Sequence, residues 1–439
     1  MSASHHVNST QHRDTAEAAW RWVLAQIRWN DGPSIPESVP GPELDPAYRN
    51  GFHMGVGGLA YVLAEIAHCR EWTVEETDLA NAIADQLTTG TPDETSYTFF
   101  DGLVSTIGVL TALDAPGTRA AVLRLNQLAT PTGWVQSDFE PADLLPDARF
   151  NDVTLGTAGV LLAAVWAHRN GVSEARELAE SAAAVLVDEM ETLPTGVNWP
   201  FVPERYLTRA RRDMPNFSHG LSGIASALAV AGAELGRPDL TALATRGAEH
   251  LVTLGTLDGA GFAVPHYVPR DDIDADEFTH NWCHGGAGTS LLFSALHRAG
   301  VAEVAGDAPL TWHRRCLHGV RASGLPARRY PGFWDNDGRC CGTAGVADIF
   351  LSSWQRSGDP DDLAFALLLA DTLVERAVVS GPHAYWRFTE HRDAEPLLPP
   401  GVGWGQGAAG IAAYLFRVSR LDRDAAVVAR MDSWWTTDR

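Results

Sequence analysis

One repeated unit constrains the fold of this chain more than any other feature of its sequence. The unit is a Gly-x-x-Gly turn followed at once by an apolar segment of helical character, and it recurs about every 50 to 65 residues. The seven copies begin at Gly55, Ser105, Gly156, Gly220, Gly285, Gly342 and Gly407. The second is a weaker copy, with serine in the first glycine position. Such recurrence is typical of folds that stack one helical unit on the next.

Amphipathic segments with helical spacing lie between the copies, for example over residues 173–193, 239–255 and 361–378. The segments after the turns are apolar nearly all round, as expected of buried inner helices. The last copy ends near the C-terminus without an obvious polar cap, which favours a closed ring over an open solenoid. The sequence therefore predicts an all-α fold, a closed (α/α)7 toroid of seven inner and seven outer helices. Short strand-like stretches such as 261–268 indicate small hairpins in loops.

Composition excludes several classes of partner. The formal net charge of −22 argues against binding to nucleic acid or to anionic membranes. The polar N-terminus has no apolar core typical of a signal peptide, and apolar runs such as 160–167 are too short to span a bilayer. We expect a cytoplasmic protein. Residues 1–45 are expected to form a polar, proline-rich segment with a short helix, and residues 46–439 the toroid.

Cysteine is rare, with five in 439 residues, and three of the five stand directly before two successive turns. Because all inner helices are expected to begin at one end, Cys283, Cys340 and Cys341 should meet at one cavity. Three thiols suit a zinc ion, and catalytic zinc typically has three protein ligands and an open fourth position. Two alternatives remain: the cysteines are ordinary buried side chains, or His284 replaces one thiol as a ligand rather than lining the cavity.

Three further polar residues stand at the same end of the predicted inner helices. Asp152 and His219 precede the turns that begin at Gly156 and Gly220, and Gln406 precedes the last turn. Asp152 and His219 could serve as acid and base, or could cap the starts of their helices. Their position on the same rim as the thiols favours chemistry.

Taken together, the repeats and three motifs resemble the lanthionine synthetase C-like cyclases. The motifs are Asn-Trp-Cys-His-Gly (281–285), Arg-Cys-Cys-Gly (339–342) and Ser-His-Gly-Leu-Ser-Gly (218–223). The resemblance runs from about residue 45 to the C-terminus. It implies a seven-fold α/α toroid with zinc in a central cavity, and an enzyme that adds a peptide cysteine thiol to dehydroalanine or dehydrobutyrine to form a thioether ring.

The resemblance also assigns roles to individual residues. It makes Cys283 and Cys340 zinc ligands, with Cys341 in a place commonly held by histidine, and it matches His219 and Asp152 to the family's proposed acid/base positions. His219 would then protonate the enolate that forms when a thiol attacks the dehydro residue.

The sequence departs from the family pattern on either side of the first cysteine. His284 stands where the family usually has tyrosine, and Thr279 and His280 stand where many members carry arginine. His280 or His284 is therefore the candidate to stabilise the enolate in place of these residues.

The partner implied is a dehydrated precursor peptide, leader plus core, made by a separate dehydratase. Addition of glutathione to dehydroamino acids is an alternative reaction. A non-catalytic peptide-binding toroid is another, with a structural zinc closed by His284 or His280. A sugar-processing toroid would need a second carboxylate beside Asp152, for which Asp335 and Asp337 are the candidates.

Overall fold

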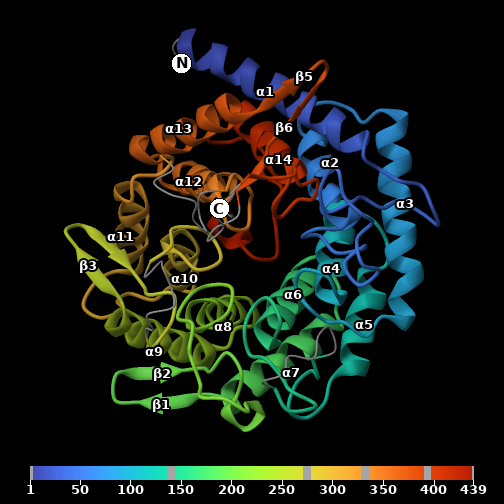
Figure 1. Cartoon of the computed structure of the whole chain (residues 1–439). Coiled ribbons are helices and arrows are strands. Elements are labelled where there is room, and N and C mark those ends of the chain that lie inside the picture. Colours follow the sequence, from blue (N-terminus) through green and yellow to red (C-terminus); the bar gives the residue numbers. More distant parts are fainter. Residues whose placement is uncertain (1–2, 137–143, 270–277, 328–335, 390–396, 438–439) are drawn as a thin grey trace.

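The computed structural model of the chain describes residues 3–136, 144–269, 278–327, 336–389 and 397–437. Within these residues, α-helices alternate along the chain between an outer and an inner ring (Figure 1). The outer helices are α1 (Ala3–Leu24), α3 (Val74–Gly90), α5 (Thr118–Leu128), α7 (Ala175–Asp188), α9 (Pro238–Leu254), α11 (Pro309–Ala322) and α13 (Pro360–Arg376). The inner helices are α2 (Leu59–Ala67), α4 (Leu103–Ala112), α6 (Thr157–Arg169), α8 (Leu221–Leu235), α10 (Gly286–Arg298), α12 (Thr343–Ser357) and α14 (Ala408–Ser419).

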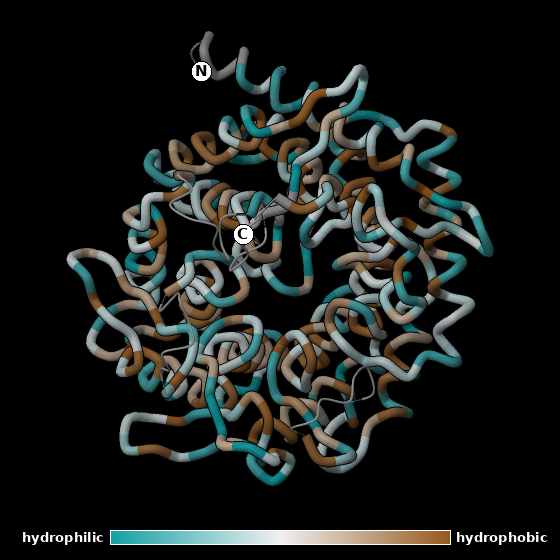
Figure 2. The backbone as a smooth tube through the Cα atoms, in the orientation of Figure 1, coloured by the Kyte–Doolittle hydropathy of each residue, from teal (hydrophilic) through white to brown (hydrophobic). Residues whose placement is uncertain are grey.

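The two rings differ in the pattern of their apolar residues, as predicted. In α8 every residue from Leu221 to Gly232 is buried, and most of these are small, so the inner helix can be surrounded on all sides. In α9 the buried apolar residues Leu240, Ala244 and Leu251 return at helical spacing, so one face packs inward and the other meets solvent. Figure 2 shows this alternation of hydrophobic and hydrophilic positions along the outer helices.

The second glycine of the repeated turn is required by a close backbone contact. At Gly223 an added Cβ would lie 1.9 Å from the carbonyl oxygen of Phe217, and at Gly410 it would lie 1.8 Å from that of Trp404. No side chain fits at these two positions, so these turns can fold back against their own helix starts only through glycine. The repeat is thus a steric requirement of the fold.

The second copy of the repeat is shifted by three residues from the predicted register. Helix α4 begins at Leu103 after Gly102, rather than after a turn beginning at Ser105. Ser105 takes the place of the second glycine, and its hydroxyl accepts a hydrogen bond from the backbone N–H of Phe52 (3.0 Å). The prediction failed here because serine replaces the second glycine of the true turn. Gly108, three residues later, makes Ser105–Gly108 look like the motif.

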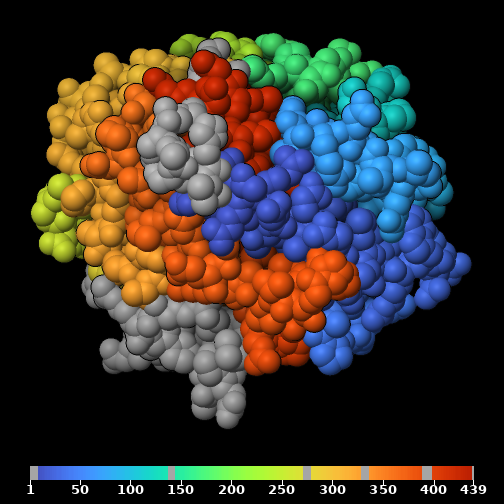
Figure 3. Space-filling view, turned by 90° about the horizontal axis from the view of Figure 1, so that it is seen from above, coloured from blue at the N-terminus to red at the C-terminus, as the bar shows by residue number. Residues whose placement is uncertain are grey.

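The ring closes between its two ends. Helix α1 packs along α14, and α14 also contacts α2, so the first and last helical pairs are neighbours. Figure 3 shows the N-terminal residues packed against those of the C-terminal third. The closed toroid predicted from the repeats is confirmed.

Short hairpins extend some of the connections from an outer helix to the next inner helix. They are β1 (Glu191–Leu193) with β2 (Gly196–Asn198), β3 (Thr256–Asp258) with β4 (Gly261–Ala263), β5 (Val378–Ser380) with β6 (His383–Tyr385), and β7 (Phe388–Thr389) with β8 (Leu397–Leu398). The stretch 261–268 therefore contributes one short strand, β4, and then continues as a loop. Among the described residues, no helix has the length and hydrophobicity needed to cross a bilayer.

Candidate metal centre and active site

A ring of hydrogen bonds joins the seven turns that precede the inner helices. We number the turns 1 to 7, from α2 to α14, and call the residue two positions before each helix-capping glycine the linking residue. The linking residues are His53, Phe100, Thr154, Ser218, Cys283, Cys340 and Gly405. Their carbonyls accept hydrogen bonds from the neighbouring turn. For example, the Thr154 N–H donates to Ser218 O (3.2 Å), the Ser218 N–H to Cys283 O (2.9 Å), and the Gly405 N–H to His53 O (2.7 Å).

One junction of this ring is built differently. Among the described residues, no backbone N–H links turns 5 and 6. Instead the thiol of Cys283 approaches the carbonyl oxygen of Cys340 at 3.1 Å. The backbone N–H of Cys340 donates onward to Gly405 O (2.9 Å), so the ring resumes at turn 7. A sulfur atom thus replaces the backbone donor where the cysteines gather.

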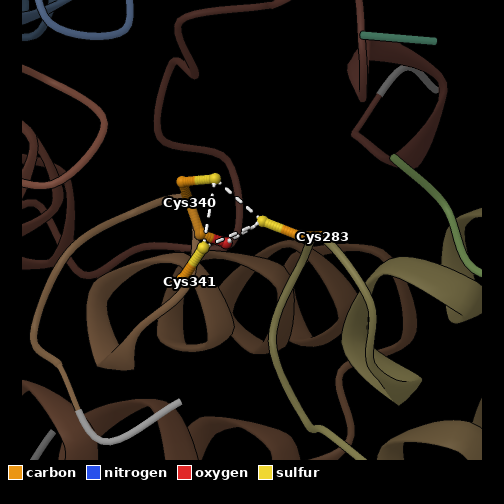
Figure 4. A group of neighbouring side chains, drawn as sticks. All are labelled: Cys283, Cys340 and Cys341. Carbon is orange, nitrogen blue, oxygen red and sulfur yellow. Dashed lines mark hydrogen bonds between the residues drawn. The ribbon is translucent and has the colours of Figure 1, made fainter. Parts of the chain in front are cut away.

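The three predicted metal ligands meet at this junction (Figure 4). The Sγ atom of Cys283 lies 2.8 Å from that of Cys340 and 3.2 Å from that of Cys341, and the last two are 3.4 Å apart. All three side chains are buried and none forms a disulfide. Cys283 comes from the turn before α10, and the other two from the turn before α12. The alternative of unrelated buried cysteines does not account for this convergence.

The electrostatics of the thiol group favour a bound cation. Hydrogen bonds from Cys283 and Cys341 lower the pKa of Cys340 to about 5, so the group carries a thiolate at neutral pH. Burial raises the pKa of Cys283, so this thiol stays protonated unless a cation binds beside it. A cation bound here would stabilise further thiolates by direct attraction.

The arrangement also fits a metal ion by size. Sulfur ligands lie about 2.3 Å from zinc, which places two of them roughly 3.7 Å apart around a tetrahedral ion. The three sulfur atoms are all within 4.8 Å of one another, and only small side-chain movements would be needed to reach that spacing. The group can therefore hold a metal ion. Among the described residues, no histidine or carboxylate completes a fourth ligand in this group.

The second predicted pair, Asp152 and His219, forms a hydrogen-bonded dyad at the junction of turns 3 and 4. His219 Nδ1 lies 2.9 Å from Asp152 Oδ2, and the hydroxyl of Thr154 donates to the same oxygen (2.8 Å). The Asp152 side chain is fully buried, whereas 26% of the His219 side chain is exposed. With Nδ1 held by the carboxylate, Nε2 is the nitrogen of His219 available to exchange a proton with a substrate.

Asp152 has a structural role as well, which explains its position in the sequence. It accepts the backbone N–H of Leu155 (3.2 Å), as Asn216 accepts that of His219 (3.2 Å) in the next turn. In turn 5, Asn281 accepts the N–H of His284 (2.9 Å) in the same way. Asp152 does not cap its helix, because α6 begins after Gly156 with no side-chain cap; its carboxylate instead braces the turn at Leu155 and reaches His219. His219 itself does not cap its helix.

His284 connects the dyad to the thiol group. It follows Cys283 directly, and its ring stacks on that of His219 with centroids 5.5 Å apart. On its other side lies the ring of His266, at 4.3 Å, from the loop after β4. His280 is half-buried, and its backbone packs against Gly285.

Sequence reasoning missed two linking residues that belong to the site. Thr154 is hydrogen-bonded to both members of the dyad, and His53 lies close enough to Cys341 for the two side chains to interact electrostatically. Both occupy the position of Cys283 and Cys340 in the repeat. Aligning all seven turns by their capping glycines would have found them.

Charged and aromatic side chains pack beside the thiols. Burial alone would raise the pKa of Asp348, but Arg339, Arg417 and Arg430 surround the carboxylate and hold the pKa well below its usual range. Arg339, Asp348 and a cluster of aromatic side chains line a small pocket of about 20 Å³ beside Cys340. That volume admits about one water molecule.

The carboxylate pair expected of a sugar-processing site is not supported. Asp337 is buried and accepts a hydrogen bond from Arg376 (2.7 Å), which makes it part of a structural ion pair. Asp335, the other candidate, lies outside the described residues.

Comparisons with known proteins agree with this geometry. A family model described as lanthionine synthetase C-like protein matches residues 46–431. Nisin cyclase superposes with a TM-score of 0.59 at 12% identity, covering 86% of this chain and 91% of that chain. Cellobiose 2-epimerase from Spirochaeta thermophila DSM 6192 gives 0.50 at 14% identity, covering 94% and 96%. D-mannose isomerase gives 0.51 at 12% identity, covering 93% and 97%.

The structural matches establish a shared α/α toroid only, since their identities are low. A search of curated protein sequences found no match. The family model, by contrast, spans most of the chain, including all seven turns and both halves of the site. The chain belongs to the lanthionine synthetase C-like family.

Proposed function

We propose that this protein is a zinc-dependent lanthipeptide cyclase, which joins peptide cysteine thiols to dehydroalanine or dehydrobutyrine in (methyl)lanthionine rings. The observation that carries the proposal is the meeting of three free, buried thiols with a histidine–aspartate dyad on one rim of the toroid. The thiols supply a metal site, and the dyad supplies a proton donor two junctions away. Thioether formation needs both.

Cys283, Cys340 and Cys341 would hold the zinc ion. When bound, zinc lowers the pKa of a coordinated substrate thiol, which is near 8.5 in free cysteine, and keeps it as a thiolate. Three sulfur ligands leave more negative charge on the metal than two sulfurs and a histidine. A substrate thiolate at this site is therefore expected to be strongly nucleophilic.

His219 would donate the proton that completes the addition. The thiolate attacks the β-carbon of the dehydro residue, the π electrons move to form an enolate, and the α-carbon then takes a proton. His219 Nε2 is suited to this donation because Asp152 holds Nδ1 and fixes the orientation of the ring. His284, stacked beside His219 and adjacent to Cys283, is placed to stabilise the enolate, and His280 is the weaker candidate.

The substrate would be a precursor peptide, leader plus core, dehydrated by a separate enzyme. Glutathione addition is a second candidate reaction, because it uses the same thiol chemistry. The purely structural zinc site is disfavoured by the missing fourth protein ligand among the described residues.

The test is ring formation on a dehydrated precursor with the purified, zinc-loaded protein. Expected is loss of free thiols at constant peptide mass, with tandem mass spectrometry and chiral analysis showing one set of rings of one stereochemistry. A parallel reaction with glutathione and a cysteine-free dehydrated peptide separates the two reactions by mass. Rings no faster or more selective than in buffer would contradict the proposal, and a glutathione adduct alone would favour the second reaction.

A further inference from the structure

A cavity of about 330 Å³ opens against the turn before α14, and one of its lining residues, Gln406, is a neighbour of Cys341. Its other wall comes from residues 34–43, which we call the strap. Backbone hydrogen bonds join the strap to this turn, from Val39 N–H to Pro400 O (2.9 Å) and from Val402 N–H to Glu37 O (3.1 Å). The volume lies at the lower end of the range for ligand sites, about 300–1,000 Å³, so it suits a short stretch of peptide.

Gln406 connects this cavity to the cysteines. Its side chain lines the cavity, and its Nε2 lies 3.9 Å from Cys341 Sγ. Its Oε1 is buried and accepts no hydrogen bond from the described residues. Because Oε1 is enclosed, a peptide in the cavity would contact the exposed part of the Gln406 side chain, next to the thiol site.

The charge that lines the cavity is negative. Glu37 contributes a carboxylate, and no lysine or arginine lines the cavity in the described part of the chain. The net charge of the whole chain, −22, adds a negative field around it. The remaining walls are largely apolar or glycine, including Leu398, Pro399 and Gly403. A cationic side chain with an apolar stem matches such walls better than a neutral or acidic one.

We propose that this cavity is the subsite for the residue next to the reacting cysteine of the substrate, and that Glu37 makes it select lysine or arginine. The inference rests on the proposed function, because it assumes that a peptide thiol reaches Cys283, Cys340 and Cys341. It goes further by assigning a binding role to the strap and to Gln406.

The test uses three acetylated, amidated tripeptides, Lys-Cys-Lys, Gln-Cys-Gln and Glu-Cys-Glu, titrated calorimetrically into the zinc-loaded protein under reducing conditions. The wild type should bind the lysine peptide about two- to fivefold more tightly than the glutamine peptide, the range expected for one solvent-accessible ion pair. Glu37→Gln should abolish this preference, and Glu37→Lys should reverse it toward the glutamate peptide. Glu43→Gln, on the same strap outside the cavity lining, should keep the wild-type preference.

Gln406→Leu tests the other contact. It should weaken binding of all three peptides by a similar factor while zinc content stays unchanged. Equal binding of the three peptides by the wild type, no binding of any, or an unaltered preference in Glu37→Lys would overturn the subsite.

The tripeptides carry no dehydro residue, so the outcome is independent of ring formation. A protein that shows the lysine preference but forms no rings would contradict the proposed cyclase activity alone. A protein that forms rings without the preference would contradict the subsite alone.

Discussion

Two junctions between neighbouring turns of the repeat hold different groups of side chains. At turns 3 and 4, the backbone N–H of Thr154 closes the ring by donating to Ser218 O, and the Asp152–His219 dyad is assembled around that bond. At turns 5 and 6 the closing contact comes from the Cys283 thiol, and the sulfurs of Cys340 and Cys341 gather beside it. The dyad is complete with protein atoms alone, whereas the thiol junction has charge and geometry suited to a cation.

The difference teaches that position in the repeat does not determine chemistry. Thr154, Cys283 and Cys340 are all linking residues, yet the Thr154 hydroxyl bonds to the Asp152–His219 dyad, and the two cysteines belong to the thiol group that can hold a metal ion. Metal binding and proton donation should therefore be separable by mutation. The following predictions are arranged from the largest expected effect to the smallest.

Cys283→Ala should have the largest effect, because it removes both a metal ligand and the closing contact of turns 5 and 6. We expect loss of nearly all bound zinc and ring formation no faster than in buffer, measured by elemental analysis and mass spectrometry. Cys316→Ala is the matched control, since Cys316 is a buried free cysteine of outer helix α11. This variant should keep its zinc. A Cys283→Ala protein with full zinc content would show that the ligand assignment is wrong.

His219→Asn should leave the metal in place and slow ring formation by about 10²–10⁴-fold, the usual effect of losing a general acid. Because thiols add slowly to dehydroalanine without a catalyst, the stereochemistry of the rings must be measured with the rate. His318→Asn, in α11, serves as the control. Wild-type rate and stereochemistry in His219→Asn would move the acid role to His284 or His280.

Thr154→Val should reduce the rate by about tenfold without loss of zinc. The change removes the hydroxyl that donates to Asp152 Oδ2 but keeps the backbone bond to Ser218, and a hydrogen bond to a charged group contributes about 1.5–3 kcal/mol. Thr154→Ser should restore most of the activity. Equal rates for the valine and serine variants would show that the hydroxyl does not support the dyad.

Removing the metal with a chelator should loosen one junction and leave the other unchanged. Amide hydrogen exchange is expected to rise several-fold in the turns before α10 and α12, because no backbone hydrogen bond joins them directly. The turns before α6 and α8 should exchange at the same rate with and without metal. An equal rise in both pairs of turns would contradict the distinction drawn between the junctions.

Much of the fold could be predicted from the sequence because its repeat records a steric requirement. Glycine is required wherever the backbone lies as close to a carbonyl oxygen as Gly223 lies to Phe217 O. The Gly-x-x-Gly pattern is therefore visible in the sequence. The prediction slipped by three residues only at turn 2, where Ser105 fills that place. The three cysteines could be singled out because a reactive residue before such a turn has no role in the repeat itself.

The rest of the site depends on contacts between distant segments. The hydroxyl of Thr154 matters only because turn 4 brings His219 to it, and Glu37 lines the same cavity as Gln406 only because the strap pairs with Val402. Neither contact leaves a local pattern, since threonine and glutamate are common in loops. Such residues become recognisable once the seven turns are superposed.

The most direct test of the central claim is the zinc content of the wild-type protein and of Cys341→Ala, measured by elemental analysis after anaerobic purification. The account predicts one tightly bound zinc per wild-type chain and a large loss in the variant, because Cys341 is one of three converging sulfurs. A wild-type protein that contains no zinc, and takes up none when it is supplied, would contradict it.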